Sequence, residues 1–191
     1  MKSPSKILPL IFVTALSIQM AGAQTAAKPD AAPKPPDSPS KVLLANWNDN
    51  GRKLIAMAED FPEDKYDFKP NPAQRSFAEQ LLHAAGGNYY FINPAKGLKP
   101  LAGDPKRADY ATKAAVVAFV KKSFAEGAEL ITSKGDAGLN DVYADPFSQG
   151  SQTRFSDGAW EFFEHAGEHY GQLVVYYRVA GLVPPESRPK K

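Results

Sequence analysis

Cysteine is absent from this 191-residue chain. This absence excludes disulfide bonds, thiolate metal ligands, a cysteine nucleophile and the acylated cysteine of a lipoprotein. Histidine is scarce, with three residues. Neither sign of charge dominates, since the chain has 23 Lys and Arg residues and 21 Asp and Glu residues. We therefore expect no nucleic-acid partner, and any metal ion must be held by His, Asp, Glu or water.

The N-terminus carries the features of a secretory signal peptide. Two lysines in Met1 to Lys6 precede an apolar run over 7–20, and Ala21-Gly22-Ala23 follows as an A-x-A cleavage site. The run is too short and too weakly flanked to indicate a membrane span. We expect cleavage after Ala23, a periplasmic or secreted protein, and no membrane association afterwards. A retained N-terminal anchor is the alternative.

The segment 24–40 is expected to be a disordered linker. It contains five prolines and many alanines and lacks the apolar spacing needed to pack. The remaining residues, 41–187, suit one domain with one core, and they show no internal repeat.

Apolar residues recur at three- and four-residue steps in four stretches, which predicts an all-α four-helix bundle. The second stretch opens with Ser76 and Glu79 in a capping-box pattern, and Gly135 and Gly181 are placed to end the third and fourth. The expected helices cover roughly 43–61, 77–93, 112–133 and 157–180. Residues 135–155 form a long loop between the last two, and loops of that length are often functional.

The three histidines predict a metal site. His165 and His169 lie 40° apart on one helix face, and His83 lies on the inward stripe of the second helix. Such histidines often only cap or pack, but burying three imidazoles without partners is costly, and one divalent ion would satisfy all of them. We expect zinc, with nickel, manganese and iron as the alternatives.

Four further side chains are candidates for catalytic roles. Glu161 or Glu79 is expected to orient a ligand or accept a proton, and Tyr90 or Tyr176 to donate a hydrogen bond. For each of them an ordinary place along the edge of the core is the alternative.

Gly86 and Gly87 stand in the middle of the second helix, one turn beyond His83. A glycine there costs roughly 1 kcal/mol against alanine, so two in succession suggest a compensating need. The need is either room for a substrate or a close approach of another helix.

His165 to His169 also matches H-x-x-E-H, the pattern of the inverted zinc peptidases, with Glu168 as the general base. Those enzymes take a third ligand from a later acidic residue, and Glu186 is the sole acid after His169. The peptidase is therefore a weaker alternative.

The fourth helix carries a second apolar strip, away from the histidines, and this strip predicts a homodimer. Burial under the 135–155 loop is the alternative. The strip consists of Phe163, Tyr170, Val174 and Tyr177, beside Gly167 and Gly171.

Four segments of the chain carry a family resemblance: Tyr66-Asp67-Phe68-Lys69-Pro70, the run Arg75-Ser76-Phe77-Ala78-Glu79-Gln80-Leu81-Leu82-His83, the run from His165 to Arg178, and Gly181 to Pro185. With them the chain resembles the DinB-like (YfiT-like) superfamily of four-helix-bundle metalloproteins over about residues 41–187.

The resemblance implies that His83, His165 and His169 bind a divalent metal ion, with water in the open positions. Family members include thiol S-transferases, thiol-dependent isomerases and metal-dependent hydrolases, so the resemblance implies a hydrolase or thiol S-transferase with a small-molecule substrate. The alternative is a non-catalytic module that binds or senses metal. The thiol enzymes of the family are cytosolic, so an export signal distinguishes this chain from them.

Overall fold

The computed structural model describes residues 38–189. The signal peptide expected over 1–23 and the linker residues 24–37 lie outside this range. Within it, no helix combines the length and the apolar character needed to cross a membrane.

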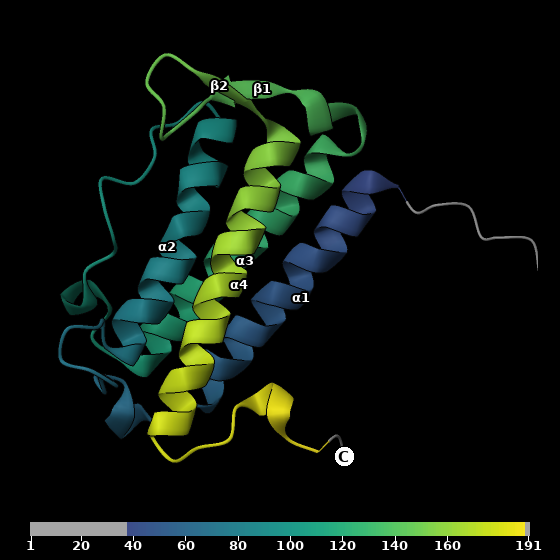
Figure 1. Ribbon diagram of the computed structural model, residues 1–191. Helices are drawn as coiled ribbons and strands as arrows, with labels where there is room; N and C mark the ends of the chain where they lie inside the picture. The colour runs from purple at the N-terminus through teal and green to yellow at the C-terminus, as the bar shows by residue number, and fades with distance from the viewer. Residues whose placement is uncertain (1–37, 190–191) are drawn as a thin grey trace, which may run out of the picture. The chain divides into compact units, whose positions relative to one another are not determined.

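The expected all-α four-helix bundle is confirmed. The helices are α1 (Pro39–Asp60), α2 (Phe77–Ala95), α3 (Lys113–Lys134) and α4 (Phe155–Val179). The 135–155 segment is less irregular than expected, because β1 (Val142–Ala144) and β2 (Gln152–Arg154) form a short antiparallel hairpin in it. In Figure 1 this hairpin crosses one end of the bundle, next to the end of α2 and the start of α4.

Polar caps explain where most of these helices begin. Ser76 and Glu79 form the expected capping box, and the Thr112 hydroxyl accepts a hydrogen bond from the third residue of α3. Ser38 caps α1 and Pro39 occupies its first turn, where a missing N–H costs nothing. Residues 39 and 40 therefore belong to α1 and not to the linker, which corrects the expected boundary by two residues.

α1 and α2 each pack against both α3 and α4. As a result, α2 and α4 are neighbours along their length (Figure 1). This adjacency brings the helix with His83 next to the helix with His165 and His169.

The core between the helices is rich in aromatic side chains. Trp47 of α1 is 1% exposed, and its indole N–H donates to the Phe124 carbonyl oxygen of α3 at 2.9 Å. The indole lies against Gly127, where a Cβ would come within 2.1 Å of Trp47 Cζ2. The third helix thus needs a glycine for α1 to approach it.

The apolar strip of α4 that predicted a homodimer lies against α1 of the same chain, where Phe163, Tyr170 and Val174 stay half-buried. Tyr177 is fully buried, and its hydroxyl donates to the Met57 carbonyl oxygen at 2.9 Å. Asn50 of α1 donates to the Phe163 carbonyl oxygen at 2.8 Å. The homodimer stays a prediction, since three of the four side chains of the strip are still partly exposed.

Replacing Gly127 by alanine is expected to destabilise the protein by about 1–3 kcal/mol, because the added methyl group collides with Trp47. The matched control is Gly171→Ala, since a Cβ at Gly171 meets no atom within 4 Å. The control should gain up to about 1 kcal/mol from helix propensity. Urea denaturation followed by circular dichroism measures both, and equal effects of the two substitutions would contradict the packing described here.

Candidate metal centre

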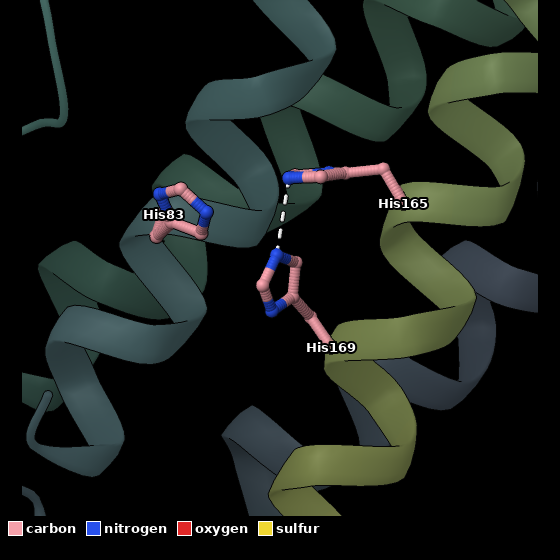
Figure 2. A group of neighbouring side chains, drawn as sticks. All are labelled: His83, His165 and His169. Atoms are coloured by element: carbon pink, nitrogen blue, oxygen red, sulfur yellow. Dashed lines mark hydrogen bonds between the residues drawn. The ribbon is translucent and has the colours of Figure 1, made fainter. Parts of the chain in front are cut away.

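The three histidines converge between α2 and α4, as the sequence predicted. Figure 2 shows His83 reaching from α2 towards His165 and His169 of α4. The ring centroids lie 5.3 Å apart for His83 and His165, 4.6 Å for His83 and His169, and 4.4 Å for His165 and His169.

This arrangement fits one divalent ion. One nitrogen from each ring lies within 4.8 Å of the other two. Two nitrogens that bind one zinc ion at about 2.1 Å each can be at most about 4.2 Å apart, so small side-chain adjustments close the site. The Nε2 atoms of His165 and His169 are already 3.0 Å apart.

Burial keeps the two histidines of α4 in the neutral form that a metal ion needs. His169 is 7% exposed, and burial lowers its pKa. Burial, reinforced by the neighbouring His169 and His83, lowers the pKa of His165 to about 4. The Nδ1 atom of His165 is buried and has no hydrogen-bond partner among the described residues. This atom faces Gly87, whereas Nε2 of the same ring faces His169 and is the nitrogen available to an ion.

Asp104, in the loop after α2, is hydrogen-bonded to His83, and no pattern in the sequence pointed to it. One of its carboxylate oxygens accepts from His83 Nδ1 at 2.7 Å, and the other accepts from Arg75 at 3.1 Å. Burial would raise the pKa of Asp104, but the contacts with His83 and Arg75 outweigh it and lower the pKa. With Nδ1 donating to this carboxylate, Nε2 of His83 is left with the lone pair that binds a metal ion.

Gln172 is the hydrogen-bond partner of His169 Nδ1, and Gln80 lies beside both. Gln172 Oε1 lies 3.1 Å from this nitrogen and also accepts from the Gln80 amide at 2.5 Å. Gln80 is 3% exposed, so this contact is sheltered from water. With Nδ1 donating to the Gln172 oxygen, Nε2 of His169 keeps the lone pair that faces the other two rings.

Gly87 provides the space for one of the histidines and not for a substrate. A Cβ on Gly87 would lie 2.4 Å from His165 Cε1, and a Cβ on Gly86 would lie 2.7 Å from Pro105 Cδ. The gap left by the two glycines is therefore filled by the His165 ring and by the loop after α2. Of the two expectations, close packing is correct.

Two of the four catalytic candidates are engaged elsewhere. The Glu79 carboxylate accepts from the Ser76 backbone N–H at 2.6 Å, and this hydrogen bond lowers its pKa. The Tyr176 hydroxyl donates to the Arg75 carbonyl oxygen at 2.6 Å. Glu79 is a helix cap and Tyr176 ties α4 to the start of α2, and the catalytic roles expected for them stay predictions.

Glu161 and Tyr90 remain candidates. Glu161 lies on the exposed side of α4. Partial burial of its carboxyl raises the pKa, and the negative charges of Asp145 and Glu164 raise it further. The Tyr90 ring is half-buried and stacks on Phe147 of the hairpin loop.

The geometry does not fit the H-x-x-E-H peptidase. The third nitrogen belongs to His83, which precedes His165 in the chain, whereas the peptidase pattern requires an acidic ligand after His169. Glu186, the sole acid there, pairs with Arg52 at 2.6 Å. Glu168 is exposed.

Comparison with known proteins identifies relatives of this bundle. The family model of the DinB superfamily matches residues 47–173, well over half of the chain. A DinB-like protein of Bacillus cereus superposes with a TM-score of 0.63 and 21% identity, covering 76% of this chain and 95% of its own. A DinB-like protein of Bacillus subtilis superposes with a TM-score of 0.61 and 17% identity, covering 78% and 99%. None of the curated proteins matches the chain.

Replacing Asp104 by asparagine is expected to weaken zinc binding by about 10- to 100-fold, because His83 loses the carboxylate that orients it. Competition with a chromogenic chelator measures the affinity. Asp67→Asn is the matched control, since Asp67 pairs with Arg107 and touches none of the three histidines. Equal affinities of the two variants would show that Asp104 does not position the ligand.

Replacing Gly87 by alanine is expected to weaken zinc binding by about tenfold or more, because the methyl group displaces the His165 ring. Gly167→Ala is the control from within the histidine segment. A Cβ there meets only Asn50 Nδ2, at an ordinary 3.7 Å, and zinc affinity should stay unchanged. A Gly87→Ala variant with the affinity of the unchanged protein would mean that the ring has room to move.

Proposed function

This chain belongs to the DinB superfamily, and from this premise we propose that it is a metal-dependent enzyme that binds zinc through His83, His165 and His169. The observation that carries the proposal is the composition of the cluster. Three imidazole nitrogens converge, and no fourth His, Asp or Glu joins them in the described part of the chain. Structural zinc sites use four protein ligands, whereas catalytic sites leave a position for water or substrate.

The reaction we propose is hydrolysis or the transfer of a low-molecular-weight thiol. A divalent ion acts as a Lewis acid and lowers the pKa of a water or thiol bound to it. His83, His165 and His169 are neutral donors in this arrangement, so the full charge of the ion remains available to the substrate. A chain without cysteine supplies no thiol nucleophile of its own.

Glu161, one turn before His165 on α4, is the side chain we assign as proton acceptor. A general base is most effective when its pKa lies near the working pH, and the surroundings of Glu161 raise its pKa towards that range. Asp145 and Glu164 contribute to the shift by placing further negative charge nearby.

We also propose that the mature protein begins after Ala23 and acts in the periplasm or the medium. The charge pattern of residues 1–23 supports this proposal. The intact mass of the protein recovered from the periplasmic fraction tests it, since a retained N-terminus would give the mass of the full chain.

Elemental analysis of the purified protein is expected to show one zinc per chain, and His165→Ala should lose it. The zinc-loaded protein should turn over either aryl esters or a thiol with an electrophilic acceptor. Glu161→Gln should keep its zinc and lose about 10²- to 10⁴-fold in turnover.

Asp67→Asn serves as the control and should match the unchanged protein in both measurements. Stoichiometric zinc without turnover of either substrate type would instead favour a module that senses or sequesters metal. A protein that binds no divalent ion would contradict the proposal as a whole.

A further inference from the structure

Three exposed apolar side chains gather around one cavity at the hairpin end of α2. The cavity has a volume of about 750 Å³ and lies between the end of α2, the residues that follow it and the β1–β2 hairpin. Leu98, Val142 and Phe147 line it and are 59%, 58% and 62% exposed. Single exposed apolar residues are common on proteins, but a group around a hollow of this size marks a ligand site.

A row of stacked rings leads from this cavity to the metal centre. Phe147 stacks on Tyr90 with centroids 5.8 Å apart and on Phe162 with centroids 6.1 Å apart. Phe162 in turn meets His165 edge-on at 5.9 Å. Phe162 is 4% exposed, so this row is packed core at that point. The half-buried Tyr90, on the same face of α2 as His83, is the ring between the cavity and the histidines that a ligand can reach.

The hairpin loop holds Phe147 in this position. The Phe147 backbone N–H donates to the Asp145 side chain at 2.8 Å, and the Asp145 backbone N–H donates to the Ser151 carbonyl oxygen at 3.0 Å. The exposed ring is thus presented by a hydrogen-bonded turn.

We propose that this cavity binds the alkyl or arylalkyl part of a substrate whose polar head reaches the metal centre. The inference rests on the proposed function and names a substrate class for it. Tyr90 is seven residues beyond His83 and Pro94 is eleven, which places them about 10 and 16 Å further along α2. The substrate is therefore an amphiphile of intermediate length, and its apolar part extends along the rings of Tyr90 and Phe147.

Straight-chain fatty acids of six to fourteen carbons are suitable probes, because their carboxylate can reach a metal ion and their chain can enter the cavity. Calorimetric titration of the zinc-loaded protein should show an affinity that rises about fourfold per methylene group until the cavity is filled. An affinity that does not depend on chain length would overturn the proposal.

Variants of the cavity locate the binding site. Leu98→Asn and Phe147→Ala should each weaken the binding of the longer acids by about tenfold, because each removes apolar surface from the lining. Val179→Asn is the matched control, since Val179 is 56% exposed on α4 and does not line the cavity. Equal losses in all three variants would place the fatty acid elsewhere and overturn the proposal.

His165→Ala separates the cavity from the metal site. This variant should bind every acid more weakly by the same factor and keep the fourfold gain per methylene, because only the head loses its partner. If His165→Ala binds all acids as tightly as the zinc-loaded protein, the cavity is not part of the metal site and the proposal fails. Failure of the proposed function itself appears separately, as the absence of zinc from the unchanged protein.

Discussion

The convergence of three imidazoles between two adjacent helices is the constraint on which the rest of the site depends. Rings this well buried are costly unless their nitrogens find partners. The chain provides partners for the outer nitrogens of two rings, through Asp104 on His83 and through Gln172 on His169. The inner nitrogens face one another, and the adjacency of α2 and α4 makes that arrangement possible.

The two sides of the three-histidine cluster differ in chemistry. On one side Arg75 joins the site to the loop after α2 through Asp104, and Tyr176 ties α4 to the Arg75 backbone. This side consists of hydrogen bonds that fix ligand positions. On the other side the rings of Phe162 and Phe147 lead towards the hairpin and the apolar cavity. Rigid positioning on one side and apolar surface on the other are what a metal-dependent enzyme with an amphiphilic substrate requires.

Periodicity and capping residues predicted all four helices, and helical spacing placed His165 and His169 on one face, because these features are local. The meeting of His83 with that pair depends on which helices are neighbours, and it was expected from the cost of burying three imidazoles and from the family resemblance. Partners that come from distant loops were not predictable. Asp104 lies in a loop with no helical or strand pattern, and only the fold brings it to His83. Gly87 was recognised as unusual, but the ring that fills its space comes from another helix. Glu79 is the opposite case, because its capping contact with Ser76 is local and was visible in the sequence, and it competes with the catalytic role expected for this residue.

Nitrogen-15 NMR of the imidazole groups tests the central claim most directly, because the chain has only three histidines. On addition of one equivalent of zinc, the Nε2 signals of His83, His165 and His169 should all shift together to the values of metal-bound nitrogen, with Nδ1 of His83 and His169 protonated. A histidine whose Nε2 signal stays unchanged at full zinc occupancy would contradict the three-histidine centre.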